Sequence, residues 1–221
     1  MYKIETHLHT VYSSRCGHLD AQTLVSAYLE KGYHGIVVTD HFSRTTCDFL
    51  NVDPAERTQA AESFLRSYYL LREEGQRRGM RIYKGSEFRF DGSDNDYLVI
   101  GYPDELLYTP DITFREGLPA FSRRCREAGA LLIQAHPFRD GCTPADPQYL
   151  DGMEVHNRNP NREDRDAPAL EYAHRFNLIQ TSGSDCHTPA QIGNGGILCE
   201  TLPETEVELI ALLRSGNYTL I

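Results

Sequence analysis

Two histidines stand two residues apart near the start of the chain, in the stretch KIETHLHTVYSS. The residues before them alternate as in a β-strand, in which residues i and i+2 point to the same face. His7 and His9 would therefore direct two imidazole rings at one point. The same spacing joins Asp185 and His187 in GSDCH, near the other end of the chain. Imidazole and carboxylate groups combined in this way favour a site for Zn, Mn or Fe.

More side chains of these types fall at the carboxyl ends of predicted strands. The strands are predicted at residues 2–9, 34–41, 81–88, 96–102, 130–138, 151–157 and 177–187. Their ends carry His7, His9, His41, His136, His156 and His187, together with Asp40, Glu87, Glu154 and Asp185. In α/β barrels this end of the strands carries the active site. The pattern predicts one converging cluster of metal ligands.

Ordinary structural roles are the alternative for each of these residues. Asp40 could cap a helix, Glu87 could be solvated, and His136 could be a buried histidine of the core. Glu154 and His156 could contact ligands or substrate rather than bind an ion. His34 precedes its strand and His174 lies in a helical stretch, so a structural role is expected for both.

Helical patterns alternate with the predicted strands. They cover residues 20–32, 54–79, 118–129 and 205–216, and the first begins after a plausible N-cap and ends at a glycine. About seven alternations of strand and helix predict parallel βαβ units that close into a barrel. We therefore expect an α/β fold with a single domain over residues 1–221.

The composition limits the partners. The chain has 221 residues, 40% of them hydrophobic, and a formal net charge of -10, which disfavours a nonspecific nucleic-acid binder. No run approaches the ~18 apolar residues that a membrane span needs. The six cysteines show no CxxC pair or disulfide spacing, which is typical of free thiols in a reducing cytosol. A cytoplasmic protein is expected.

Five motifs occur in a fixed order between residues 7 and 187: HLHT, TDH, GSE, AHP and GSDCH. This set resembles the PHP family, the polymerase and histidinol phosphatase domains. The resemblance implies a distorted seven-stranded α/β barrel with two or three divalent ions in its cleft. Most characterised stand-alone members of the family hydrolyse phosphate esters.

The resemblance also implies a set of metal ligands. His7 and His9 would bind one ion together with Glu87 and Asp185. Glu87 would bridge to a second ion held by His136, and a third ion would be held by His41 and His187.

Two departures from the family pattern favour two ions over three. Trinuclear members have a further His or Asp shortly after the first motif, where this chain reads SSRCGH. Ser14 and Arg15 are poor ligands, which leaves His18 as the substitute. Members also often supply a His after the fourth strand, where this chain reads VIGYP.

The expected chemistry is hydrolysis by a metal-bound hydroxide. Two ions can lower the pKa of a bridging water from ~15.7 towards ~7, and the hydroxide would then attack phosphorus. Glu87 and Asp185 would serve this step, and Asp185 or a freed histidine could protonate the leaving group. Arg139 is expected to grip the phosphate through its guanidinium fork, and Arg158 and His156 are further candidates for substrate contacts.

The sequence thus predicts a metal-dependent phosphoesterase acting on a small soluble metabolite, with the oligomeric state left open. Three alternatives remain: a protein-tyrosine phosphatase of the same fold, a metal-dependent amide or ester hydrolase, and a closed structural metal site. The excess of acidic over basic residues and the short chain disfavour an exonuclease.

Overall fold

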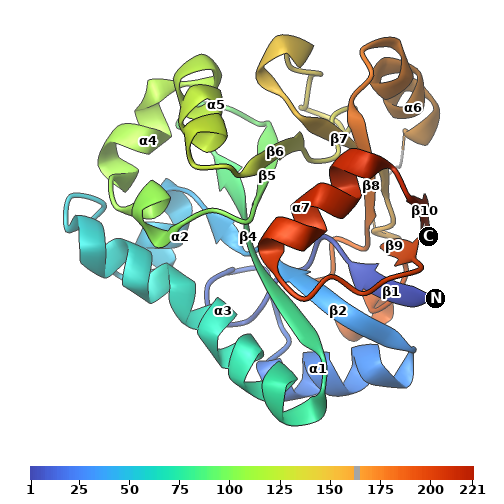
Figure 1. The fold of residues 1–221 in the computed structure, drawn as a ribbon. Coiled ribbons are helices and arrows are strands. Elements are labelled where there is room, and N and C mark those ends of the chain that lie inside the picture. Colours follow the sequence, from blue (N-terminus) through green and yellow to red (C-terminus); the bar gives the residue numbers. More distant parts are fainter. Residues whose placement is uncertain (162–164) are drawn as a thin grey trace.

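The computed structural model describes residues 1–161 and 165–221, in which a mixed sheet curves into a nearly closed barrel (Figure 1). The strands are β1 (Tyr2–Glu5), β2 (Tyr33–Val38), β3 (His41–Phe42), β4 (Arg81–Arg89), β5 (Asp96–Ile100), β6 (Leu131–Gln134), β7 (Gly152–Asn157), β8 (Ile179–Gly183), β9 (Ile197–Cys199) and β10 (Tyr218–Leu220). Their order in the sheet is β10-β9-β1-β2-β4-β5-β6-β7-β8, with β3 paired to β4.

Seven α-helices connect the strands in the described part of the chain. They are α1 (Ala21–Glu30), α2 (Arg44–Leu50), α3 (Arg57–Arg78), α4 (Pro110–Glu116), α5 (Leu118–Glu127), α6 (Asp166–Arg175) and α7 (Glu206–Ser215). Helices α1, α3, α4, α5 and α6 lie around the outside of the sheet (Figure 1). The predicted helices correspond to α1, α3, α5 and α7. Within the described residues, no helix combines the length and the apolar character needed to cross a bilayer.

The barrel closes where the chain continues beyond β1 and β8. Leu8 forms an isolated parallel bridge with Cys186. The amide of His9 donates to the Cys186 carbonyl at 2.8 Å, and the hydroxyl of Thr6 donates to the Ser182 carbonyl at 2.6 Å. This seam brings the first and last sequence motifs, HLHT and GSDCH, side by side.

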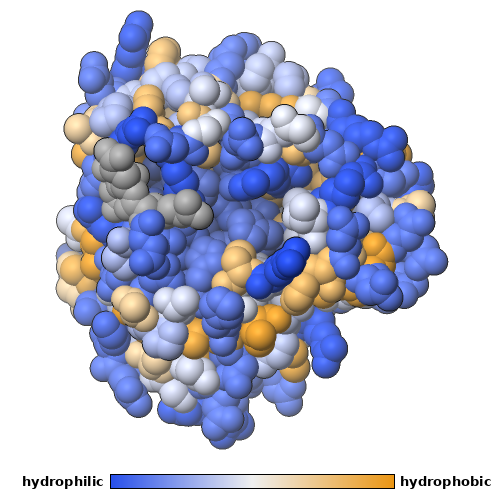
Figure 2. All heavy atoms as spheres, turned by 180° about the vertical axis from the view of Figure 1, so that it is seen from behind, coloured by the Kyte–Doolittle hydropathy of each residue, from blue (hydrophilic) through white to orange (hydrophobic). Residues whose placement is uncertain are grey.

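Helix α7 closes one end of the barrel. Its buried residues Leu209, Ile210 and Leu213 belong to the same apolar cluster as Ile4 and Tyr83 of the strands. Figure 1 shows α7 crossing the front of the barrel. The apolar side chains fill this end, so the carboxyl ends of the parallel strands, at the other end, remain for polar side chains. Figure 2 shows that opposite face, which is hollowed near its centre and lined there by hydrophilic residues.

The expectation of a barrel built from seven parallel strands is wrong in part. Strand β5 runs antiparallel to both β4 and β6, because the short connection at residues 90–95 joins β4 and β5 as a hairpin. The three-residue strands β9 and β10 add an antiparallel edge beyond β1. As a result, the start of β5 lies at the same end of the barrel as the carboxyl ends of the parallel strands.

Candidate metal centre

Four buried side chains meet at the carboxyl end of the barrel. The Nε2 atom of His7 lies 3.2 Å from His9 Nε2, and 3.4 Å from both Asp185 Oδ1 and Glu87 Oε1. His9 Nε2 lies 3.2 Å from Asp185 Oδ1 and 3.3 Å from Glu87 Oε2. None of these four residues is more than 2% exposed.

These separations fit ligand atoms that share one ion. Atoms bound about 2.0–2.2 Å from a four-coordinate ion lie roughly 3.3–3.6 Å from one another. In addition, Glu87 Oε2 is fully buried and accepts no hydrogen bond of normal geometry from the described residues. A buried carboxylate oxygen without such a bond is costly unless a cation offsets it. The donor set of two imidazoles and two carboxylates therefore fits a divalent ion.

Glu87 divides its two oxygens between two groups of histidines. Oε1 lies 2.9 Å from His136 Nε2 and faces His7, whereas Oε2 lies 2.8 Å from His41 Nδ1 and faces His9. The residue belongs to β4, whose neighbours β3 and β5 hold it in the middle of this end of the sheet. A carboxylate in this position can bridge two ions.

The rings of His7 and His9 are oriented through their other nitrogens. His7 Nδ1 lies 2.9 Å from Glu154 Oε1, so a proton on Nδ1 leaves Nε2 with a free lone pair. His9 Nδ1 lies 3.2 Å from the hydroxyl of Ser14, which donates to Asp40 at 2.6 Å. Hydrogen-bonded carboxylates of this kind orient metal-binding histidines.

Asp40 itself does not reach the cluster, because Thr10 and Ser14 occupy its two oxygens. These contacts make Asp40 a support for the loop that follows His9 rather than a ligand.

Replacing Glu154 by glutamine is expected to weaken metal binding by roughly 10–100-fold, because the charge that fixes the His7 ring is lost. The affinity is measured by competition with a chromogenic chelator. Glu116→Gln is the control, since Glu116 pairs with Arg124 instead of the cluster residues. Equal affinity in the Glu154→Gln and Glu116→Gln proteins would contradict an orienting role.

A further buried carboxylate, that of Glu5, links β1 to the residues that follow β8. It accepts hydrogen bonds from the amides of Thr6, His7 and Ser184 and from the hydroxyls of Tyr28 and Ser184. Burial raises the pKa of Glu5, although these hydrogen bonds oppose the shift. The carboxylate thereby fixes the backbone on both sides of the seam.

Two cluster residues have an unusual backbone conformation. His136 has φ +29° and Asp185 has φ +47°, in the left-handed region that residues other than glycine seldom adopt. Such strain persists where the surrounding structure imposes it, often at functional sites. Here it turns two side chains into the cluster directly after their strands.

The charges in the cluster are mutually dependent. Burial lowers the pKa of His7, but Glu154, Glu87 and Asp185 raise it well above its usual value. Burial raises the pKa of Asp185, yet His7 and His9 hold it well below the usual range. Asp185 is therefore an ionised carboxylate, which suits ligation and not the donation of a proton to a leaving group.

The pKa of His9 is lowered well below its usual value by burial and by the nearby His187 and His41. Its ring is thus neutral, the form in which histidine binds metals.

Arg139 is the one predicted substrate residue that touches the cluster. Its guanidinium donates to Asp185 Oδ2 at 2.8 Å and to Asn157 Oδ1 at 2.9 Å. Because Asp185 faces the histidines through Oδ1, the arginine and the ligand atoms use different oxygens of the same carboxylate.

His156 and Arg158 lie elsewhere. The pairing of β7 with β8 has an irregularity between Glu154 and His156, which breaks the alternation of faces expected of a regular strand. His156 and Arg158 both lie beside Asp166 of α6, whereas Asn157 reaches Glu154. The contacts of the described residues therefore do not support the prediction that His156 and Arg158 reach the site.

His18 is exposed, and it contacts the site through its backbone, which donates to the His187 carbonyl at 3.0 Å.

Asp96 was not among the expected ligands, although it lies in the cluster. Its Oδ2 is 3.8 Å from His136 Nε2, and its carboxylate lies close enough to His41 and Glu87 to share an ion with them. Both oxygens of Asp96 also accept hydrogen bonds from Arg89. The residue begins β5, whereas a parallel strand would place its other end, VIGYP, at the cluster. The turn signal DGSDN before Asp96 was the available indication of a hairpin.

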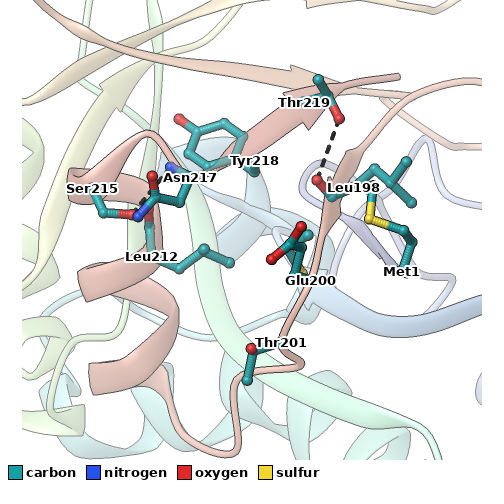
Figure 3. A pocket seen from close by; sticks show the side chains of 10 residues that line it. Met1, Leu198, Glu200, Thr201, Leu212, Ser215, Asn217, Tyr218 and Thr219 are labelled. Atoms are coloured by element: carbon teal, nitrogen blue, oxygen red, sulfur yellow. Dashed lines mark hydrogen bonds between the residues drawn. The ribbon is translucent and has the colours of Figure 1, made fainter.

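The larger surface cavities lie away from this cluster. The pocket in Figure 3 lies between α7, β9 and β10, and the side chains of Met1, Glu200 and Tyr218 are among those that line it. It contains none of the clustered histidines or carboxylates. This pocket of about 530 Å³ is therefore separate from the candidate metal centre.

The chain was compared with family models, curated proteins and solved structures. Residues 167–218 match the family model described as PHP-associated. No curated protein matches the chain.

Solved structures share the fold. A two-domain protein from Bacteroides vulgatus, containing a predicted PHP-like metal-dependent phosphoesterase, aligns with 100% of this chain at TM-score 0.75 and 18% identity. The chain spans 64% of the length of that structure. A protein from Bifidobacterium adolescentis, proposed to be a metal-dependent phosphoesterase, aligns at TM-score 0.56 and 18% identity over 96% of this chain and 95% of its own.

An amidohydrolase from Chromobacterium violaceum, with bound sulfate and no metal, aligns at TM-score 0.54 and 15% identity over 98% of this chain and 97% of its own. These likenesses and the match at residues 167–218 confirm the resemblance to PHP-like proteins that the five motifs indicated.

Proposed function

We propose that this protein is a metal-dependent phosphoesterase that hydrolyses a small phosphorylated metabolite. The observation that carries the proposal is the convergence of four buried side chains. His7 Nε2, His9 Nε2 and Asp185 Oδ1 lie 3.2–3.4 Å from one another, and the two carboxylate oxygens of Glu87 lie 3.4 Å from His7 and 3.3 Å from His9. The PHP-like phosphoesterases among the structural neighbours support it.

Two or three divalent ions of Zn, Mn or Fe are the proposed cofactors. His7, His9, Asp185 and Glu87 would hold the first ion, and Glu87 would bridge to a second ion held by His136. Asp96 is a further candidate ligand, because it can share an ion with His41 and Glu87. Ions bound there would act as Lewis acids and activate water. The protein residues hold the ligand atoms in place and keep them away from bulk solvent.

Arg139 is the proposed contact for the phosphate group. Its side chain is 19% exposed and thus reaches the solvent side of the cluster while remaining bonded to Asp185. Burial lowers the pKa of Arg139, but Asp185 raises it above the usual value, so the guanidinium stays charged. A charged guanidinium group that is held beside the metal ligands can bind a phosphate oxygen with directional hydrogen bonds.

Hydrolysis of an amide is the second candidate, since one structural neighbour is an amidohydrolase. The position of Arg139 favours the phosphate ester, because a neutral amide has no need of a guanidinium beside the reacting group. A protein-tyrosine phosphatase would use the same residues and differ in the substrate.

The test combines metal analysis with a substrate screen. Protein purified without chelator or nickel resin is expected to contain about two or more Zn, Mn or Fe per chain, measured by mass spectrometry. The loaded protein is then assayed on phosphomonoesters, phosphodiesters, phosphotyrosine peptides and amides. Turnover of amides alone, or the absence of metal uptake when Zn, Mn and Fe are supplied, would refute the proposal.

Replacing Arg139 by alanine is expected to lower kcat/KM for a phosphate ester by roughly 10²-fold, about 2.7 kcal/mol, through loss of a charge-assisted contact. Arg158→Ala is the matched control, because Arg158 pairs with Asp166 on α6. Both proteins should retain their metal. Equal activity of the two variants would show that Arg139 does not contact the phosphate.

A further inference from the structure

The loop that follows β8 carries Asp185 and His187 and ends in a short 3₁₀ turn, η3 (Pro189–Gln191). The last residue of this turn, Gln191, is only 2% exposed. Its Oε1 accepts hydrogen bonds from the amide of His187 at 2.7 Å and from the amide of Thr188 at 2.8 Å. Because two backbone donors hold Oε1, the orientation of the Gln191 amide is fixed and its Nε2 faces the other way.

The nitrogen of Gln191 contacts a second buried amide, that of Asn159. Nε2 donates to Asn159 Oδ1 at 2.8 Å, and the same oxygen accepts a hydrogen bond from the amide of Asn161 at 3.1 Å. Since two donors hold this oxygen, the nitrogen of Asn159 faces Asp185. Its Nδ2 lies 3.4 Å from Asp185 Oδ2 and 3.5 Å from the Asp185 carbonyl oxygen. The amide pair of Gln191 and Asn159 thus connects the turn η3 to a residue of the metal cluster.

Asp185 requires support because of its backbone conformation and its position. Its φ of +47° is one that residues other than glycine adopt only where the surrounding structure imposes it. Arg139 and Asn159 both donate to Oδ2 of its carboxylate. The other oxygen, Oδ1, faces His7 and His9. The contacts at Oδ2 therefore determine where Oδ1 lies relative to the other ligand atoms.

A simpler role for Gln191 would be to stabilise the turn alone. Thr188 and Gln191 form a capping box, in which the side chain of the fourth residue accepts a hydrogen bond from the amide of the first. Capping requires only the acceptor Oε1, and glutamate provides it as well as glutamine does. The donor Nε2 has no part in the capping box, so its bond to Asn159 indicates a second role.

We propose that Gln191 and Asn159 are positioning residues, which hold Asp185 in the orientation that metal binding requires. This inference rests on the proposed function, since Asp185 is one of the ligands of the first ion. Gln191 acts through Asn159, and Asn159 acts through the oxygen of Asp185 that does not face the histidines. Loss of the amide pair should weaken metal binding and not abolish it, because Arg139 still holds Oδ2.

Three substitutions separate the amide pair from the capping box. Gln191→Glu keeps the acceptor and removes the donor to Asn159. Gln191→Met removes both without adding a charge, and Asn159→Leu breaks the pair without changing the capping box. The affinity of each metal-free protein for Zn²⁺ is measured by competition with a chromogenic chelator. We expect all three to bind Zn²⁺ roughly tenfold or more weakly than the native protein.

Two further proteins test whether the effect comes from one contact. Asn159→Leu combined with Gln191→Met should bind Zn²⁺ no more weakly than the weaker single variant, because both changes remove the same link. Ser122→Ala is the control for loss of a buried hydrogen bond. Its hydroxyl donates to the Tyr149 carbonyl at 2.7 Å, and the residue lies on α5. This variant should unfold at a lower denaturant concentration and keep the native affinity for Zn²⁺.

The possible failures are distinguishable. Native affinity in both Gln191→Glu and Asn159→Leu would restrict Gln191 to the capping box and refute the positioning role. An equal loss of affinity in Ser122→Ala would attribute the effect to general destabilisation and also refute it. In either case, binding of Zn²⁺ by the native protein would leave the proposed function intact. A native protein that takes up no Zn, Mn or Fe would refute both.

Discussion

The Glu87→Gln protein should lose most of its metal and at least ~10³-fold in kcat/KM, about 4 kcal/mol of transition-state stabilisation. The side chain keeps its size, but an amide is a much poorer metal ligand than a carboxylate. Because the two oxygens of Glu87 face different histidines, a single substitution affects both proposed ions. Mass spectrometry of the purified protein and assay on the best phosphate ester measure the two effects.

Glu127→Gln, at an exposed position on α5, is the control and should behave as the native protein. His9→Ala combined with Asp185→Ala should reproduce the loss of metal through different ligands. A Glu87→Gln protein that retains two ions per chain would show that this carboxylate does not bridge them.

Replacing Gly183 by alanine should disturb the cluster by a purely steric route. A Cβ atom there would lie 2.3 Å from His7 Cβ and 2.7 Å from Glu154 Oε1. Since His7 Cβ is attached directly to the backbone and Glu154 Oε1 is held by His7 Nδ1, β8 must move away from the segment that follows β1. We expect a loss of roughly 1–3 kcal/mol in the free energy of unfolding and at least tenfold weaker metal binding, because the His7–Glu154 pair is displaced.

Gly152→Ala is the matched control. A Cβ atom at Gly152 would lie 2.7 Å from the Ile179 carbonyl oxygen, a comparable clash between β7 and β8 at the end of β8 that lies away from the cluster. Denaturant unfolding should show both variants destabilised, whereas metal titration should show a defect in Gly183→Ala alone. A similar metal affinity in both variants would indicate that the packing at Gly183 does not position His7.

The pairs at i and i+2 were the most informative part of the sequence. Strand geometry alone predicts that His7 and His9 converge, and their Nε2 atoms do lie 3.2 Å apart. The positions of Glu87, His136 and Asp185 at the ends of predicted strands also indicated that they belong to the cluster, because the carboxyl ends of parallel strands lie at the same end of a barrel. The α/β barrel itself followed from the same alternation of elements.

The features that were missed depend on local departures from regular strands. Asp96 joins the cluster because β5 is antiparallel, and His156 leaves it because of the irregularity in β7. Neither change alters the hydrophobic alternation from which strands are predicted.

The seam between Leu8 and Cys186 links the metal centre to the folding of the whole chain. The groups it joins come from opposite ends of the sequence, and the bond between Thr6 and Ser182 spans 176 positions. Contacts of such high sequence separation form late and slowly during folding. An ion bound only by the closed barrel would stabilise it by mass action, by about 2.7 kcal/mol at a free concentration 100 times Kd. Slow release of the ion to a chelator would then report how often the seam opens.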